Sequence, residues 1–122
     1  MSSKIEKAAL EFKSGKNCSQ AILCAFAEET GITNEDAMSI AAPLGGGKKI
    51  KCGAVLAAEI ILCNPGSIKD KDDLYNNSEK IAEFENRFKE KNTSIICKEL
   101  KAGLRSCMGC VKDSVAILED MI

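Results

Sequence analysis

The chain has 122 residues, a net charge of −1, no histidine, no tryptophan and one tyrosine. Its length fits one domain, its apolar content of 45% is enough for a packed core, and its few aromatic residues favour helices over a β-sandwich. The balanced charge argues against nucleic acid or an anionic membrane as a partner, and the lack of histidine excludes His-dependent catalytic triads, His-ligated zinc enzyme sites and c-type haem attachment.

The first part of the chain predicts three helices. Apolar residues at helical spacing indicate a first helix that ends at Gly15. Asn17 and Gln20 form a capping-box signature, and we expect the helix that they open to continue to Gly31. A shorter third helix is expected over residues 34–42, where it is closed by a proline.

The most apolar part of the chain is the predicted fourth helix, residues 53–63. It is apolar on nearly every side, so we expect it at the centre of the fold. Glu59 is the only charged residue in this run. Because the run is too short to span a bilayer, no transmembrane segment is predicted.

The second half of the chain continues the helical pattern. Helices are expected over residues 72–91, 95–102 and 111–122, and no strand pattern competes with them. Residues 1–122 therefore predict one all-α domain, a bundle of about five to seven helices around a buried helix over residues 53–63.

The seven cysteines divide into two groups. Cys24 and Cys63 lie within or at the end of apolar helices, where cysteine usually acts as a small buried hydrophobe. The other five lie near predicted helix N-termini, where free N–H groups and the helix dipole favour a thiolate, which is both the nucleophile and the metal ligand: Cys18, Cys52, Cys97, Cys107 and Cys110. The N-terminus lacks an apolar signal core, so we expect a cytoplasmic protein with ligand or redox thiols rather than structural disulfides.

Five sequence segments, in order, carry a family resemblance: "NCSQAILCAFAEE", "GGG", "CGAVLAA", "SIICKEL" and "C..CVKDSVAILEDM". Their order resembles the small bacterial and archaeal proteins of the C_GCAxxG_C_C family, which are described as redox-active. Gly53 of the central motif is kept, Ala57 stands where its last glycine is expected, and Cys110 occupies a commonly apolar position. The four signature cysteines carry over to Cys18, Cys52, Cys97 and Cys107.

The resemblance implies a cofactor and an assembly. The C-terminal part of split-Soret cytochrome c is similar to this family. This similarity implies a dimer and an iron–sulfur cluster, expected to be [2Fe–2S]. The implied ligands are Cys18, Cys52, Cys97 and Cys107, beside Gly53. Cys110 would be a fifth thiol able to replace a ligand. The expected function is electron transfer or redox sensing with an unidentified redox partner protein; if the chain is an enzyme, it is an oxidoreductase.

Two alternatives fit the same cysteines. In the first, no metal is bound and a thiol pair, Cys107 with Cys110 or Cys18 with Cys52, cycles between dithiol and disulfide. In the second, four thiolates hold a structural zinc ion, which makes the domain an interaction module without turnover.

Overall fold

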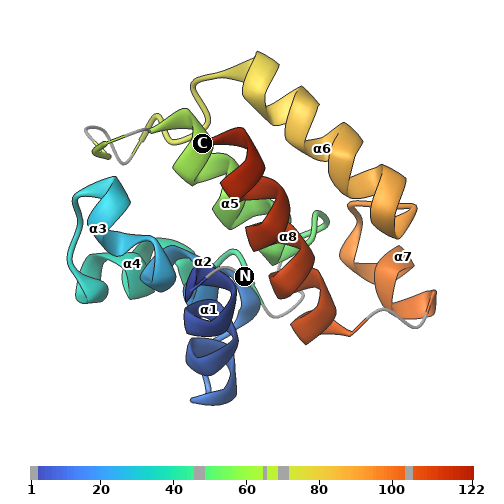
Figure 1. Cartoon of the computed structure of the whole chain (residues 1–122), viewed down its shortest axis with the longest axis horizontal. Helices are drawn as coiled ribbons and strands as arrows, with labels where there is room; N and C mark the ends of the chain where they lie inside the picture. Colours follow the sequence, from blue (N-terminus) through green and yellow to red (C-terminus); the bar gives the residue numbers. More distant parts are fainter. Residues whose placement is uncertain (1–2, 46–48, 65, 69–71, 104–105) are drawn as a thin grey trace.

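The computed structural model describes residues 3–45, 49–64, 66–68, 72–103 and 106–122. Within these ranges the protein is all helical and has no β-sheet, which confirms the predicted fold class (Figure 1). No helix there is long and apolar enough to cross a membrane. The helices in chain order are α1 (Ser3–Lys13), α2 (Cys18–Ala25), α3 (Ala27–Thr30), α4 (Asn34–Ala41), α5 (Gly53–Cys63), α6 (Ser78–Asn92), α7 (Cys97–Ala102) and α8 (Cys107–Met121).

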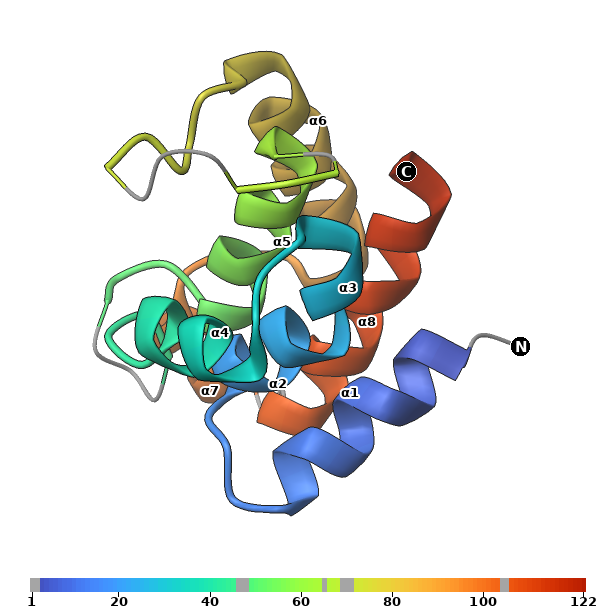
Figure 2. The same cartoon turned by 90° about the vertical axis from the view of Figure 1, so that its left-hand side faces the viewer.

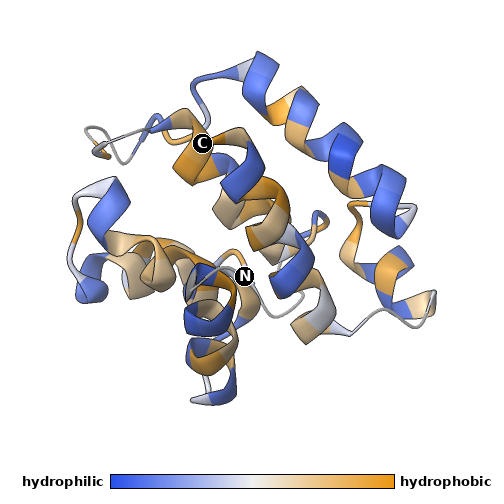
Figure 3. Cartoon of the chain, viewed as in Figure 1, coloured by the Kyte–Doolittle hydropathy of each residue, from blue (hydrophilic) through white to orange (hydrophobic). Residues whose placement is uncertain are grey.

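Helix α5 is the centre of the fold, as its apolar sequence predicts. All of its residues are buried, and it packs against α2, α6 and α8. Figure 3 shows the contrast with α6, which is hydrophilic apart from one apolar stripe. That stripe places the Phe84 and Phe88 rings in the core, stacked with their centroids 6.2 Å apart. Burial of α5 on all sides supplies the hydrophobic stabilisation that holds the surrounding helices together.

Helices α5 and α8 lie side by side and run in the same direction (Figure 1). Ser114 of α8 contacts Ala54 in the first turn of α5, and the last residues of both helices line one cavity at the opposite end. Helix α1 packs against α2 and α8, and α4 packs against α2 (Figure 2). The N-terminal ends of α2, α5 and α8 are consequently close together.

The predicted second helix is wrong in its extent. It divides into α2 and α3 at Phe26, whose backbone leaves helical values (φ −109°, ψ 19°) while its side chain is fully buried. Gly31 ends α3 in a left-handed conformation, which glycine adopts without strain. This division raises the number of helices to eight in the described ranges, above the five to seven that we expected.

The predicted fifth helix is also too long at its N-terminal side. Helix α6 begins at Ser78, because the Asn77 side chain accepts a hydrogen bond from the Lys80 N–H and caps the helix there. The buried Asn64 amide donates to the Leu74 carbonyl at 2.9 Å and holds the preceding residues in an irregular conformation. The last helix begins earlier than predicted, at Cys107, because Ser106 accepts a hydrogen bond from the Gly109 N–H.

Candidate functional site

Each cysteine of the N-terminal group lies at or near a helix start, as predicted. Cys18, Cys97 and Cys107 are the first residues of α2, α7 and α8, and Cys52 is the N-cap residue of α5. Cys110 lies in the first turn of α8. The two remaining cysteines, Cys24 and Cys63, are buried in the core. All seven are free thiols.

Local capping explains the position of Cys18. The Asn17 side chain accepts a hydrogen bond from the Gln20 N–H at 2.8 Å, and the Gln20 side chain accepts one from the Asn17 N–H at 3.0 Å. The Asn17 amide also donates to the Ala42 carbonyl at 3.2 Å. The capping box therefore both starts α2 and ties Cys18 to the end of α4.

Two buried hydroxyl groups join three helix starts. Ser19 of α2 donates to the Gly53 carbonyl at 2.6 Å, and Ser114 of α8 donates to the Ala54 carbonyl at 2.8 Å. Both serines are fully buried. Because each bond ends on the first turn of α5, the cysteines of α2 and α8 are held beside Cys52.

At Gly53 the start of α5 packs closely against the Cys18 sulfur. A Cβ atom at this position would lie 2.7 Å from the Cys18 Sγ and 2.9 Å from the Leu44 carbonyl oxygen. Real Cβ atoms do not approach other atoms this closely, so only glycine allows the Cys18 sulfur to lie against the start of α5.

Cys52 and Cys110 are in side-chain hydrogen-bond contact, and they affect each other in opposite directions. The Cys52 hydrogen bond lowers the pKa of Cys110, which outweighs the opposing effects of burial and of negative charge on Cys107, Asp113 and Cys18. The same hydrogen bond, together with burial, raises the pKa of Cys52. In this contact the Cys52 thiol is therefore the donor and the Cys110 sulfur the acceptor.

The helix start was expected to lower the pKa of Cys52, but the pKa of Cys52 is raised. The N–H groups of Ala54 and Val55 do lower the pKa of Cys52, but the hydrogen bond to Cys110 and burial raise it more. Cys52 is only 5% exposed, and a charged group loses hydration when it is buried. Of these two cysteines, Cys110 therefore has the lowered pKa and Cys52 the raised one.

Cys97 reaches the site through a short backbone pairing. Lys51 and Ile96 form an antiparallel β-bridge, in which the Cys52 N–H donates to the Ile95 carbonyl at 2.7 Å and the Cys97 N–H donates to the Ile50 carbonyl at 3.0 Å. Cys52 and Cys97 each follow a bridge residue, which makes them diagonal neighbours on one face. In a regular antiparallel pair such neighbours are roughly 7–8 Å apart.

A sequence model of one protein family matches residues 16–121, and it carries the description "Putative redox-active protein (C_GCAxxG_C_C)". The chain belongs to the C_GCAxxG_C_C family. Neither the curated proteins nor the solved structures that were compared with the chain gave a match.

The C_GCAxxG_C_C signature corresponds to one place in the fold. The structure brings Cys18, Cys52 and Cys110 to the N-terminal end of α5, and the β-bridge joins Cys97 to it. The Cys107 side chain, at the first residue of α8, is exposed. In the described ranges, no three His, Cys, Asp or Glu side chains are already arranged to bind a metal ion. The predicted ligand set, the role of Gly53 and the cofactor therefore stay predictions.

The donor set is compatible with an iron–sulfur cluster in its chemistry. Thiolates are the usual cluster ligands, and free N–H groups at helix starts offset their negative charge. The missing Cβ at Gly53 lets the Cys18 sulfur pack directly against the start of α5. The residues at the start of α5 thus fit the kind of group that the family resemblance implies.

Sequence reasoning missed the two serines that assemble the site. Ser114 shares the inward face of its helix with Val111, Val115 and Leu118, and Ser19 follows the predicted ligand Cys18. A polar residue on an otherwise apolar helix face is the signal that could have identified Ser114, because buried hydroxyl groups need a hydrogen-bond partner.

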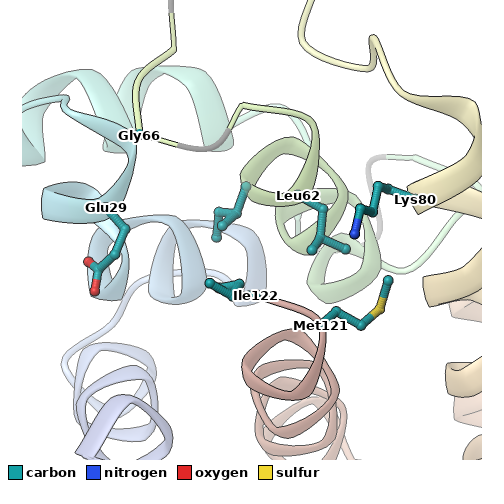
Figure 4. A pocket seen from close by; sticks show the side chains of 7 residues that line it. Glu29, Leu62, Gly66, Lys80, Met121 and Ile122 are labelled. Carbon is teal, nitrogen blue, oxygen red and sulfur yellow. The ribbon is translucent and has the colours of Figure 1, made fainter.

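A cavity of about 400 Å³ lies at the opposite end of α5 (Figure 4). Its lining contains no cysteine, so it is separate from the thiol site. The lining residues are Glu29, Ile61, Leu62, Gly66, Lys80, Met121 and Ile122.

Proposed function

We propose that this redox-active protein binds an iron–sulfur cluster, expected to be [2Fe–2S], at the N-terminal end of α5 and uses it for electron transfer or redox sensing. The observation that supports the proposal is the meeting of cysteine-bearing helix starts from α2, α5 and α8, with α7 joined by the Lys51–Ile96 bridge. A dithiol pair requires two cysteines, whereas a cluster requires four.

The ligands of the proposed cluster are Cys18, Cys52 and Cys97, with Cys107 or Cys110 as the fourth. When bound, such a cluster supplies one-electron exchange. The chain contributes the positive ends of helix dipoles, which favour thiolates and raise the reduction potential, and it contributes burial, which excludes water from Cys52 and Cys110.

A second function is supported by the direct contact between Cys52 and Cys110. Without metal, and with the start of α8 displaced so that the buried Cys110 sulfur can be reached, the Cys110 thiolate attacks a disulfide of a partner protein, and one thiolate of that partner leaves. Cys52 then loses its proton and attacks the Cys110 sulfur, which releases the second partner thiolate and closes a Cys52–Cys110 disulfide. The two electrons pass to the partner disulfide, which is reduced to a dithiol.

The two functions are separated by metal analysis of protein purified without oxygen. We expect a coloured protein with iron and acid-labile sulfide in equal amounts. Colourless, metal-free protein that titrates as a reversible dithiol would contradict the cluster proposal and favour the second function. Stoichiometric zinc without sulfide would contradict both and indicate a structural zinc site.

Cysteine variants sharpen the distinction. Cys18→Ala and Cys97→Ala should lower cluster content, because each removes a ligand, but they should leave a Cys52–Cys110 dithiol able to oxidise. Cys110→Ala should abolish the dithiol. Cys24→Ala is the matched control, since Cys24 is buried in α2 on the same helix as Cys18 but is not at the site.

The partner proposals are a homodimer and a cytoplasmic redox protein that exchanges electrons with the cysteine site. Light scattering of the purified protein at several concentrations tests the dimer. A monomer at all concentrations would contradict it.

A further inference from the structure

Glu59 is a carboxylate buried in the middle of the most apolar helix. It is fully buried, and its Oε2 atom has no hydrogen-bond partner within the described ranges. Its Oε1 atom lies 3.4 Å from the Lys51 Nζ. Burial of a polar atom without a partner is costly, so a residue of this kind at the centre of a core calls for a role other than packing.

Lys51 is shared between two carboxylates. Its Nζ lies 2.6 Å from the Glu85 Oε2 as well as 3.4 Å from the Glu59 Oε1. With both acids ionised, one positive charge faces two negative charges, and protonation of one acid removes the excess. Glu59 is the acid that takes the proton, because burial raises its pKa to about 8 and the neighbouring Glu85 carboxylate adds to that rise.

Two further titratable groups lie within electrostatic range of Glu59. They are Tyr75, in the segment before α6, and Cys63, at the end of α5, and negative charge on Glu59 contributes to the raised pKa of each. Lys89 of α6 acts on Glu85. In the described ranges, Lys51 and Glu85 are the charged side chains that act on Glu59 itself.

The Glu59 cluster is linked to the thiol site by short connections. Lys51 directly precedes Cys52 and forms the β-bridge that leads to Cys97. Glu59 lies seven residues after Cys52 on the same side of the fold's central helix, which corresponds to about 10 Å along the helix axis. Across a protein interior, charges at this separation interact much more strongly than they would in water.

We propose that Glu59 is the internal proton acceptor of the redox centre, taking up a proton when the cysteine site is reduced and releasing it when the site is oxidised. The inference rests on the proposed function, since it requires a centre that gains and loses electrons. Glu59 acts at a distance, by binding a proton whose charge offsets that of the added electron. It touches neither the cofactor nor the reacting thiols.

In a one-electron centre, reduction is coupled to the binding of one proton by Glu59. One electron from a one-electron carrier enters the site, one proton from solvent binds the Glu59 carboxylate, and no other bond changes. Lys51 and Glu85, whose side chains are 32% and 20% exposed, connect the buried carboxyl group to solvent. For the dithiol, two electrons from a reduced partner break the Cys52–Cys110 disulfide, the Cys52 sulfur binds one proton, and Glu59 binds a second proton that offsets the charge on the Cys110 thiolate.

The test is proton uptake by the intact protein during reduction with titrated dithionite in weakly buffered solution containing a pH indicator. We expect uptake near pH 8 in the unmodified protein and one proton fewer in Glu59→Gln. Well below that pH, Glu59 is protonated in both redox states and the two proteins should agree. A reduced-minus-oxidised infrared spectrum should show a protonated carboxyl band that Glu59→Gln lacks.

Two further variants complete the design. Glu83→Gln removes a carboxylate from an exposed ion pair with Arg87 on α6 and should behave as the unmodified protein does. Glu85→Gln keeps Glu59 but removes the neighbour that raises its pKa, so the uptake should shift to lower pH. This variant decides the question if Glu59→Gln does not fold.

Equal uptake by Glu59→Gln and the unmodified protein, or no shift in Glu85→Gln, would overturn the inference and leave the proposed function intact. Absence of any reversible redox change would overturn both. Loss of uptake in Glu59→Gln with retention in Glu83→Gln supports the inference.

Discussion

Ser114 donates a 2.8 Å hydrogen bond to the carbonyl of Ala54, which lies 60 residues earlier in the chain. The bond connects the second turn of α8 to the first turn of α5, next to the contact between Cys110 and Cys52. A single buried hydroxyl group thus links the two helices that carry the central thiol pair.

Ser114→Ala should destabilise the protein by about 1 kcal/mol, the usual net value of a buried hydrogen bond. It should also weaken the coupling between Cys52 and Cys110, because α8 loses its attachment beside them. Urea denaturation measures the stability. Ser39→Ala, at an exposed position within α4, is the control and should change stability little. Equal effects of the two substitutions would contradict the role of Ser114.

Gly53→Ala should destabilise the protein by about 1–3 kcal/mol, because the added Cβ would meet the Cys18 sulfur and the Leu44 carbonyl oxygen. It should also lower the cofactor content, since Cys18 would be displaced. Thermal unfolding and iron analysis are the measurements. Gly103→Ala is the control, because a Cβ there would make only ordinary contacts of 3.5 Å or more.

Cys52→Ala should raise the pKa of Cys110 in the metal-free protein. The hydrogen bond from Cys52 is the main cause of the lowered pKa, and burial then acts unopposed. The measurement is the pH dependence of alkylation at Cys110, resolved from the other cysteines by mass spectrometry. Cys63→Ala lies outside the site and should leave the profile of Cys110 unchanged; an unchanged profile in Cys52→Ala would show that the pair is not coupled.

The stability advantage of the unmodified protein over Glu59→Gln should fall as the pH rises. The pKa of Glu59 is about 8 in the folded protein, against 4.5 for an ordinary glutamate in the unfolded chain, so the folded state binds more protons between these values. The contribution is fully present below about pH 4.5 and lost above about pH 8, a change of a few kcal/mol at about 1.4 kcal/mol per pKa unit. Urea denaturation from pH 5 to pH 9 measures it. A constant difference between the two proteins would contradict the raised pKa.

Glu85 titrates in the opposite direction and does not obscure this result. Burial opposes its ionisation, but its interactions with Glu59 and Lys51 outweigh burial and lower its pKa. Its contribution to stability is present above its unfolded pKa and is lost as the pH falls through the folded one. The loss therefore occurs at more acidic pH than the change assigned to Glu59.

Local signals in the sequence were sufficient for most helix starts and for the central helix. Asn17 with Gln20 caps α2 through bonds made within one turn, and α5 is apolar on nearly every side, so no distant residue was needed to predict either. The same local character explains why five cysteines could be assigned to helix starts. The division at Phe26 was missed because it depends on a buried side chain. The start of α6 was placed too early because the local cap at Asn77 was not recognised and because the distant Asn64 holds the preceding residues.

Only the tertiary structure decided which thiols meet and which of them has the lowered pKa. The pairing of Cys52 with Cys110 depends on Ser114, and the approach of Cys18 depends on Ser19 and on the absence of a Cβ at Gly53. These contacts join residues far apart in the chain, and no helical periodicity or capping motif encodes them. The sequence by itself determined that the cysteines lie where helices begin, because a helix start is set by its neighbours. The opposite pKa shifts of Cys52 and Cys110 arise from burial and from a hydrogen bond across two helices, which exist only once the chain has folded.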